Sequence, residues 1–400
     1  MSRRRVAFVI HRYGRGGAEY LCQVAAERLA QRHDVTVLTT CAIDHETWAN
    51  ALPAGESVEN GVRIRRFPTK HARSPDFNAM LGHVLSGHAT VADERAWLRA
   101  QGPHSPELLD EIARTKDTFD TMFFVTYLYE PTAIGLQLAP ERAVLIPTAH
   151  DEPPIRASVF RELFRAPRHI MFLTPAERRF VHQLFGNHDI PSTIASMGLE
   201  PVPDVSGDEF RARHGIAGHL LVYLGRVEGA KGCEELVEWM RAYPRSGEVT
   251  LALVGQNVMR TRSAPPILPL GIVSDREKHE SLRAATVFIM PSAYESLSIA
   301  TLEAWQHGVP VLVNQGSEVL VDHVRASKGG LYFRGKVDLA AALDTLLDDP
   351  SLRHRMGLNG QRYVAANYTW ERVDAAYDRV IEEVAAGRQR PRSPVPRGEG

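Results

Sequence analysis

The chain has 400 residues, of which 24% are charged and 44% hydrophobic, and its formal net charge is −1. This length exceeds what one hydrophobic core usually organises, so we expect two domains. A charge near zero provides no electrostatic footprint for nucleic acid, and we expect no nucleic-acid partner. The three cysteines are widely scattered, which fits neither a disulfide framework nor a zinc site and suits a reducing compartment.

The N-terminal stretch predicts a strand, a glycine-rich turn, a helix and a second strand. Residues 6–10 are a continuous apolar run, as in a parallel strand that is covered on both faces. Gly14, Gly16 and Gly17 follow, and apolar residues then recur at helical spacing until a second strand at 35–39. This order is a βαβ unit, the building block of a doubly wound sheet. The first apolar run is too short for a signal sequence or a membrane span.

Residues 70–120 differ in composition, being rich in His, Arg, Asp and Glu, and should contain helices interrupted at 101–106. Glycine and proline between 197 and 208 predict a linker. The remaining strands expected in the first half are 122–125, 143–146 and 169–173, followed by a helix start at 174–177. We therefore place an N-terminal Rossmann-like domain at residues 1–198.

The second half repeats the alternation of strands and helices. The expected strands are 220–224, 249–254, 286–290 and 310–313, and the expected helices are 233–241, 275–284, 299–306 and 339–347. This pattern predicts a second Rossmann-like domain at 199–368, a C-terminal helix at 369–386 and a disordered tail at 387–400. The fold class is α/β, with two doubly wound units that face a ligand site between them.

A pair of cations follows the first strand of the second domain. Gly225-Arg226 comes directly after that strand, and Lys231-Gly232 opens the next helix. A helix start offers free N–H groups and a positive dipole end, and the two side chains add full positive charges. Together these groups suit a diphosphate and the charge that develops when it leaves. The same residues also fit two solvated surface cations near a turn.

A second group of residues surrounds the start of the helix at 299–306. Glu295 lies in the preceding loop and Glu303 lies inside the helix, with seven residues between them. A loop carboxylate can face sugar hydroxyls, and a helix carboxylate can accept both hydrogen bonds of a ribose diol. The N–H groups of Leu297, Ser298 and Ile299 lie at the helix start, where they favour a phosphate. A capping carboxylate beside an ordinary surface glutamate is the other interpretation.

These motifs, in this order and spacing, resemble the retaining glycosyltransferases of family 4, which have the GT-B fold. The resemblance rests on Gly225-Arg226, Lys231-Gly232, and Glu295 with Glu303-Ala304. It extends over nearly the whole chain, because the following segments match as well: Gly16-Gly17-Ala18-Glu19, Gly308-Val309-Pro310-Val311 and Tyr368-Thr369-Trp370.

The resemblance implies a role for each matching residue. Arg226 and Lys231 would hold the donor diphosphate, Glu303 would bind the ribose, and Glu295 would face the donor sugar. Gly16 and Gly17 would bring backbone N–H groups to the phosphates from the other domain. The segment that ends at Val273 would lie along the nucleobase, and His150 would touch the transferred sugar.

One departure from the family concerns the donor loop. The family usually has phenylalanine-glycine where this chain has Leu297-Ser298. The serine keeps its N–H for the phosphate, but the sugar pocket can differ, so the donor sugar stays open. The resemblance also implies transfer with retention of configuration, without a covalent nucleophile. We expect no cofactor and no metal, because cations and helix ends provide the positive charge.

Other functions fit parts of the pattern. A sugar phosphorylase or a nucleotide-sugar epimerase on the same fold shares the phosphate and sugar contacts. A nicotinamide-dependent oxidoreductase is disfavoured, because the second strand ends at Thr39-Thr40 without the acidic residue that binds a ribose. A silent homologue that only binds is disfavoured by the intact Arg226, Lys231, Glu295 and Glu303.

The acceptor is not identified by the sequence: a glycan, a lipid-linked or a small-molecule hydroxyl would each fit. Residues 70–120 are the segment expected to set acceptor specificity, and the side chains considered for its lining are Trp97, Gln101, His104, Tyr127 and Tyr129, which packing would explain equally. We expect a cytoplasmic enzyme. Arginines at 12, 15, 156, 161, 165 and 168 make a peripheral membrane contact conceivable, beside the simpler interpretation of a solvated basic face.

Overall fold

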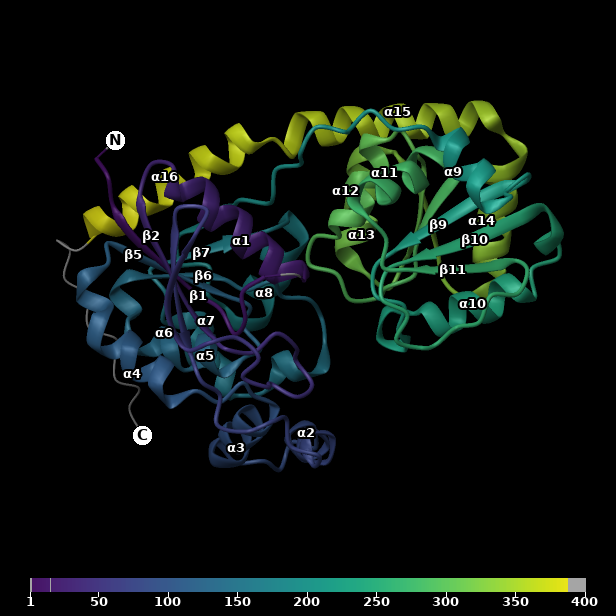
Figure 1. Cartoon of the computed structure of the whole chain (residues 1–400). Helices are drawn as coiled ribbons and strands as arrows, with labels where there is room; N and C mark the ends of the chain where they lie inside the picture. The colour runs from purple at the N-terminus through teal and green to yellow at the C-terminus, as the bar shows by residue number, and fades with distance from the viewer. Residues whose placement is uncertain (1, 15, 388–400) are drawn as a thin grey trace. The chain divides into compact units, whose positions relative to one another are not determined.

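The computed structural model of the protein describes residues 2–14 and 16–387 (Figure 1). The chain forms two compact units. Of the described residues, the first contains those up to 173, those from 178 to 195 and those from 374 to 387. The second contains residues 174–177 and 196–373. The tail expected to be disordered lies, apart from Gly387, outside the described residues.

The first unit is built on a sheet of eight strands in the order β3-β4-β2-β1-β5-β6-β7-β8. The hairpin of β3 and β4 is antiparallel and the other ladders run parallel. The central strand β1 is apolar because helices cover both faces of the sheet. The strands are β1 (Arg5–Val9), β2 (Asp34–Thr40), β3 (Gly55–Glu59), β4 (Val62–Phe67), β5 (Thr121–Val125), β6 (Ala143–Ile146), β7 (His169–Phe172) and β8 (Ser192–Ile194).

The C-terminal helix α16 (Trp370–Ala386) packs on the sheet of the first unit. Its Tyr377 ring contacts Phe8 and Phe123, with centroids 6.4 and 5.2 Å away. Ion pairs join the helix to α1, to the residues just after α1 and to the residue before β1: Arg28 with Asp374 at 2.6 Å, Arg32 with Asp378 at 2.9 Å and Arg4 with Glu382 at 2.6 Å. The other helices are α1 (Gly17–Ala30), α2 (Phe77–Leu85), α3 (Val91–Gln101), α4 (Pro106–Thr115), α5 (Glu130–Ala133), α6 (Gly135–Leu138), α7 (Val159–Arg165) and α8 (Pro175–Phe185).

The segment at 70–120 contains helices α2, α3 and α4, with the expected break at residues 102–105. Three of the side chains considered for an acceptor site are core residues instead: Trp97 is fully buried, Gln101 is 2% exposed and Tyr127 is 1% exposed. The Trp97 ring packs against Phe77 and Phe160. Packing therefore accounts for Trp97 and Tyr127, as burial favours for large aromatic side chains, and the Gln101 side chain donates a hydrogen bond to the carbonyl of Leu128 at 3.1 Å.

The second unit is a parallel sheet of six strands in the order β11-β10-β9-β12-β13-β14. Its strands are β9 (His219–Leu224), β10 (Val249–Val254), β11 (Ile267–Gly271), β12 (Val287–Met290), β13 (Val311–Asn314) and β14 (Gly330–Phe333). Its helices are α9 (Gly207–His214), α10 (Cys233–Arg241), α11 (Asp275–Ala284), α12 (Ile299–Gln306), α13 (Glu318–Ser327), α14 (Lys336–Asp348) and α15 (Pro350–Asn367). Asp348 ends α14, and Asp349 is the N-cap of α15, where its side chain accepts the N–H of Leu352 at 2.8 Å.

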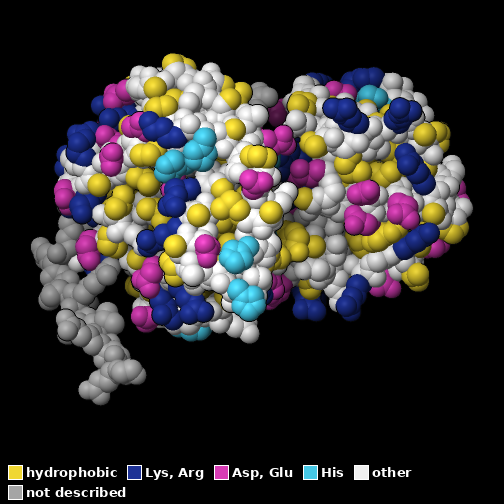
Figure 2. All heavy atoms as spheres, turned by 90° about the horizontal axis from the view of Figure 1, so that it is seen from below, with side chains coloured by type: hydrophobic (Ala, Val, Ile, Leu, Met, Phe, Trp, Pro, Cys, Tyr) yellow, Lys and Arg dark blue, Asp and Glu magenta, His cyan; other side chains and the backbone are white. Residues whose placement is uncertain are grey.

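The surface carries charges of both signs. On the face displayed in Figure 2, Lys and Arg side chains alternate with Asp and Glu over both units. Among the described residues, none of the helices combines the length and the apolar character needed to cross a bilayer.

Three buried histidines predict that the fold loses stability in mild acid. Burial lowers the pKa of His169, His307 and His323 to about 4. An unfolded histidine titrates near 6.5, so between these values the unfolded chain binds more protons and the free energy of unfolding falls as the pH falls. We expect a loss on the order of 1–2 kcal/mol per histidine at pH 5. Urea titrations at pH 7 and pH 5 measure it.

His169→Gln removes one of these groups and should flatten the pH dependence between pH 7 and 5. His88→Gln, at an exposed position, is the matched control and should leave the dependence unchanged. Parallel pH profiles for wild type and His169→Gln would contradict the assignment.

Candidate functional site

The predicted site residues of the second unit follow strands that end at one edge of a parallel sheet. In such a sheet, ligands bind outside the carboxyl ends of the strands. Arg226 follows β9, Val273 follows β11, and the loop with Glu295 follows β12. Since β9 lies between β10 and β12, the loops after these strands are neighbours.

The loop after β9 holds Arg226 by its backbone. Gly225 has a φ of 150° and donates its N–H to the carbonyl of Val254 at 2.9 Å. The buried Tyr223 hydroxyl donates to the carbonyl of Arg226 at 2.7 Å. The Arg226 guanidinium pairs with Glu228 at 2.8 Å and its side chain is 42% exposed. The backbone is thus fixed while the charged end remains accessible to a ligand.

Lys231 and Glu295 form an ion pair between the loops after β9 and β12. Lys231 Nζ lies 2.8 Å from Glu295 Oε1, and the two side chains are 33% and 13% exposed. Burial lowers the pKa of Lys231, but the charge and hydrogen bond of Glu295, together with Glu228, outweigh burial and raise it. Lys231 is therefore cationic at neutral pH and over the whole range below its ordinary pKa.

Gly232 sets the distance between these two loops. Its φ of 72° lies in the left-handed region, and a Cβ at this position would be 2.7 Å from the carbonyl oxygen of Pro291. A side chain would thus add both backbone strain and a clash with backbone. The glycine of the Lys231-Gly232 motif is what allows Lys231 to reach Glu295.

The loop after β12 turns into α12 at Ser298. This serine has a φ of 62°, in the left-handed region that side chains rarely adopt, and it occupies the N-cap position. Its hydroxyl lies 2.9 Å from Thr301 Oγ1. Leu297 and Ser298 are buried, and Ile299 is the first helical residue. The first N–H groups of a helix have no acceptor within it and are available to an anion.

Glu303 lies in α12 and has a partner that the sequence interpretation missed. Lys278 Nζ, from α11, lies 2.7 Å from Glu303 Oε1. Both side chains are mostly buried, at 21% and 16% exposed. Lys278 lies in the first turn of α11, shortly after Val273. Its position just after the carboxyl end of β11 is a signal in the sequence that could have identified it as a site residue. Nothing in the local spacing indicates that it reaches α12.

Val273 lies just beyond the carboxyl end of β11. Gly271 ends the strand with a φ of 70°, and its carbonyl accepts the N–H of Gly255 at 2.8 Å. Ile272 is 74% exposed, and Ser274 then caps α11. Val273 therefore lies at the edge of the sheet where strands β9 and β10 also end.

In the first unit, Gly16 and Gly17 begin α1 after the central strand. Gly16, at the N-cap, has a φ of 147°, and a Cβ there would meet the carboxylate of Glu19, which folds back over it. That carboxylate binds His11 at 3.1 Å and Arg12 at 2.6 Å. Burial raises the pKa of Glu19, but the hydrogen bond and charge of His11 and the charge of Arg12 lower it to about 2. The sequence interpretation did not assign His11 or Arg12 to this turn.

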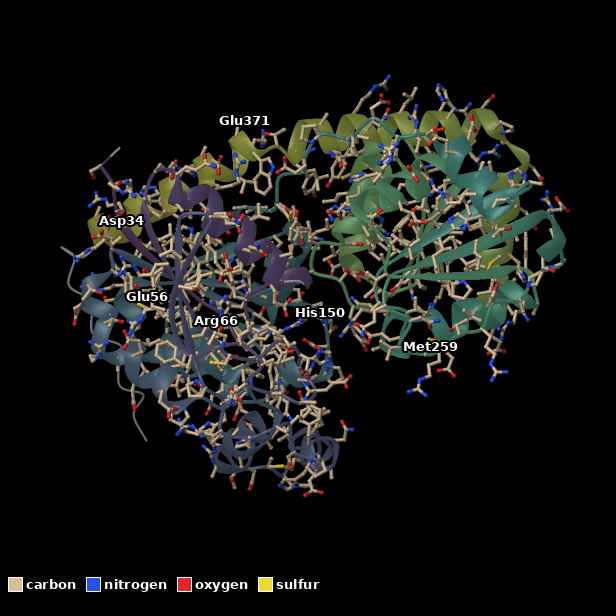
Figure 3. All side chains as sticks on the ribbon, in the orientation of Figure 1. Asp34, Glu56, Arg66, His150, Met259 and Glu371 are labelled. Atoms are coloured by element: carbon tan, nitrogen blue, oxygen red, sulfur yellow. The ribbon has the colours of Figure 1, made fainter. Side chains whose placement is uncertain are left out.

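His150 lies in the loop after β6 of the same unit (Figure 3). Its ring is 25% exposed, and Nε2 lies 3.5 Å from Glu152 Oε2. Glu152 in turn accepts the hydroxyl proton of Tyr127 at 2.6 Å. A buried tyrosine thus holds the carboxylate that orients His150, at the carboxyl edge of the first sheet.

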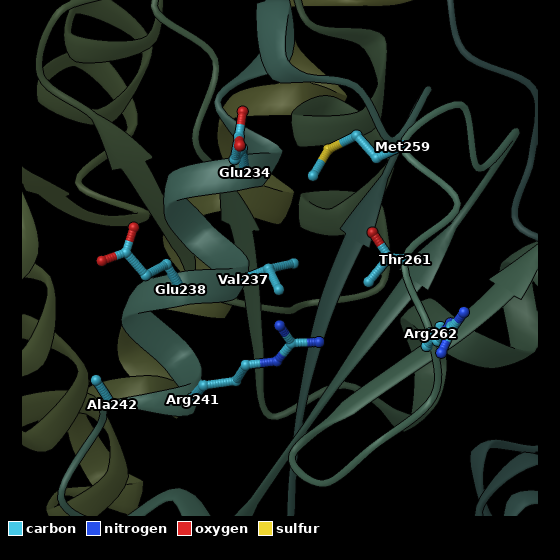
Figure 4. A pocket seen from close by; sticks show the side chains of 8 residues that line it. All are labelled: Glu234, Val237, Glu238, Arg241, Ala242, Met259, Thr261 and Arg262. Carbon is cyan, nitrogen blue, oxygen red and sulfur yellow. The ribbon is translucent and has the colours of Figure 1, made fainter.

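A shallow pocket lies apart from these residues, on the outer side of α10. Its volume is about 650 Å³, and it opens between that helix and the loop after β10 (Figure 4). Glu234 and Met259 lie toward one end and Arg241 and Arg262 toward the other. None of the residues predicted for the site lines it.

Among the described residues, no group of three or more His, Cys, Asp or Glu side chains is arranged to hold a metal ion. Three carboxylates at the second unit's edge are each paired with a cation: Glu228 with Arg226, Glu295 with Lys231 and Glu303 with Lys278. The arrangement thus combines several cations with helix N-termini, a combination that binds and stabilises anionic groups.

Comparison with known proteins gives the class. The structure resembles sucrose-phosphate synthase from Thermosynechococcus elongatus, with a TM-score of 0.71, 18% identity and coverage of 96% of this chain and 100% of that one. It also resembles HepE from Anabaena in complex with UDP-glucose, with a TM-score of 0.68, 15% identity and coverage of 96% and 100%. The fold is GT-B, as predicted.

The sequence comparisons agree with the fold. Residues 208–363 match the family described as glycosyl transferases group 1. Over 402 aligned positions the chain is 22% identical to glycogen synthase of Mycobacterium tuberculosis, covering 92% of this chain and 91% of the relative. The second unit therefore carries a glycosyltransferase domain of group 1, the domain that holds Arg226, Lys231, Glu295 and Glu303.

The close approach at Gly232 leads to a prediction about geometry. Gly232→Ala should displace Lys231 from Glu295 and lower kcat/KM for the sugar donor at least tenfold, because it combines left-handed strain with a backbone clash. Steady-state kinetics and thermal unfolding measure the two effects. Gly215→Ala is the matched control: its φ is 64°, but a Cβ there meets no atom within 4 Å. It should cost about 1–2 kcal/mol of stability and leave kcat/KM within twofold. Equal activity losses in the two variants would refute the role of the approach.

Proposed function

We propose that this glycosyltransferase takes a sugar from a nucleotide-diphosphate donor and transfers it to a hydroxyl with retention of anomeric configuration. The observation that carries the proposal is the pairing of Lys231 with Glu295, beside Arg226, where β9 and β12 end. Two cations and a helix start suit the diphosphate, and a carboxylate in contact with one cation suits the sugar that the diphosphate carries.

The leaving diphosphate dominates the chemistry. Breaking the bond between the anomeric carbon and the phosphate oxygen leaves negative charge on that oxygen. Lys231 and Arg226 stabilise this charge, together with the N–H groups that begin α12. These groups are already fixed before the donor arrives, so they need little reorganisation as the charge develops.

Lys231 has two partners in this proposal, Glu295 and the diphosphate. Without a ligand it neutralises Glu295. When the diphosphate binds, the lysine can serve both anions, and Glu295 is then available to the hydroxyls of the sugar. Glu303, held by Lys278, receives the ribose diol, and Val273 lies along the base.

The first unit would contribute Gly16, Gly17 and His150. The N–H groups of the two glycines would approach the diphosphate, and His150, oriented by Glu152, would contact the transferred sugar. We assign the acceptor hydroxyl to this unit. The diphosphate itself would accept the proton of that hydroxyl. The hydroxyl would attack the anomeric carbon from the same face that the diphosphate leaves, which retains the configuration without a protein nucleophile.

The nucleotide and the sugar stay open. A complex of UDP-glucose is known for the similar Anabaena protein, which supports a nucleotide-sugar donor and a hexose. Because protein cations provide the charge, we further propose that neither a metal nor a cofactor is needed.

A thermal-shift screen tests the function. UDP, GDP, ADP, dTDP and their sugar conjugates are added in the presence of EDTA. One nucleotide should raise the unfolding midpoint, since a ligand at 100 times its Kd stabilises by about 2.7 kcal/mol. Lys231→Ala should lose this shift, and transfer should fall at least about 100-fold, as expected for one stabilising group.

Arg213→Ala is the matched control, because it also removes a cation 2.8 Å from a buried carboxylate of the same unit, that of Glu280. It should keep both the shift and the turnover. A normal turnover of Lys231→Ala would remove the diphosphate assignment. Stabilisation by inorganic phosphate or NAD in place of any nucleotide would instead favour a phosphorylase or an oxidoreductase.

The two glutamates should respond differently to substitution. Glu303→Ala should mainly raise KM for the donor, because the ribose diol is bound equally before and during the reaction. Glu295→Ala should mainly lower kcat, because the sugar changes its charge and shape in the transition state. Each variant loses one lysine pair of nearly equal length, so the loss of an ion pair is matched. The reverse kinetic pattern would exchange the two roles.

A further inference from the structure

His323, on α13, contacts the loop after β12 from the core of the second unit. The residue is only 2% exposed. Its Nε2 lies 3.1 Å from the carbonyl oxygen of Leu297. Its Nδ1 lies 3.0 Å from the hydroxyl of Tyr363 and 3.3 Å from that of Tyr368. The two hydroxyls are 3.2 Å apart. We call these groups, from Tyr368 through Tyr363 and His323 to the Leu297 carbonyl, the relay.

The direction of the relay follows from its chemistry. A carbonyl oxygen only accepts, so Nε2 of His323 carries a proton and donates to Leu297. Burial lowers the pKa of His323 to about 4, so the ring is neutral near pH 7 and Nδ1 accepts. The shorter contact assigns the donor to Tyr363, whose oxygen then accepts the proton of Tyr368. Every polar group of the relay is thereby satisfied.

The end of the relay fixes one peptide plane of the donor loop. In a trans peptide the carbonyl and the following N–H point in opposite directions. With the Leu297 carbonyl directed to His323 in the core, the N–H of Ser298 is directed away from it. Ser298 is the left-handed residue that begins α12, and α12 carries Glu303.

The start of the relay lies near the segments that connect the two units. Tyr368 follows α15, and its carbonyl accepts the N–H of Leu199 at 3.1 Å. The Trp370 indole donates to Glu200 at 2.8 Å. Besides the short excursion at residues 174–177, the chain passes from one unit to the other after residues 195 and 373, and the segments at these two crossings are joined close to Tyr368.

We propose that His323 is a positioning residue, held by Tyr363 and Tyr368, that directs the N–H of Ser298 at the diphosphate of the donor. The inference rests on the proposed function, because it assigns a purpose to the same loop. His323 touches no substrate and acts only through the Leu297–Ser298 peptide.

The test combines kinetics and spectroscopy. The double variant Tyr363→Phe/Tyr368→Phe removes both hydroxyls while keeping the rings, and it should raise the donor KM by about five- to tenfold with kcat changed less than threefold. Tyr243→Phe is the matched control, since it removes another tyrosine hydroxyl of the same unit, which binds Asp344. It should leave KM unchanged. If the double variant does not fold, Tyr363→Phe alone is measured and should raise KM at least twofold.

Nitrogen NMR of His323 measures the protonation and the tautomer of its ring, and it does not require enzymatic turnover. The wild type should show a neutral ring with the proton on Nε2. A proton on Nδ1, or a charged ring at pH 7, would overturn the inference even if the enzyme transfers sugar. A donor KM within twofold of wild type in a folded double variant would also overturn the inference, because the relay would then have only a structural role. Absence of any nucleotide binding by the wild type would refute the proposed function, and the inference with it, although the NMR result would still describe the relay correctly.

Discussion

The site of the second unit depends on how closely the backbones of two loops approach at one edge of its parallel sheet. The loops after β9 and β12 meet at Gly232 and the carbonyl of Pro291, where a Cβ would be 2.7 Å from the oxygen. This approach lets Lys231 reach Glu295 at 2.8 Å. Parallel strands supply the common edge, and the left-handed glycine removes the side chain that would keep the loops apart.

The glycine-rich turn before α1 of the first unit is also fixed around a glycine, but by a different set of contacts. The Glu19 carboxylate occupies the space that a Cβ at Gly16 would need. His11 and Arg12 hold this carboxylate in place. The negative charge at the start of α1 is thus already neutralised by a cation and a hydrogen bond. In both units a glycine occupies the N-cap of a helix, and neighbouring ion pairs fix the turn.

Most of the strands could be predicted because buried parallel strands are continuous apolar runs. The helices predicted at 233–241, 275–284 and 299–306 match the bounds that the structure gives. The elements that escaped prediction lack such patterns. Strand β4 alternates Arg with apolar residues, and β11 is an edge strand with an internal proline. Site residues next to strand ends were predicted from their spacing. Lys278 and His323 instead make contacts to other elements, and no local spacing indicates such contacts.

Ser298 shows why the surroundings of the donor loop matter more than its own residue. A left-handed φ costs a side chain roughly 1–2 kcal/mol, a cost that glycine at this position would avoid. The chain retains serine, whose hydroxyl bonds to Thr301, while the preceding carbonyl is held by His323. The conformation is therefore imposed by contacts on both sides of the residue. A loop held in this way keeps its N–H direction when neighbouring side chains change, so under the proposed function the contact to the diphosphate and the choice of sugar can vary separately.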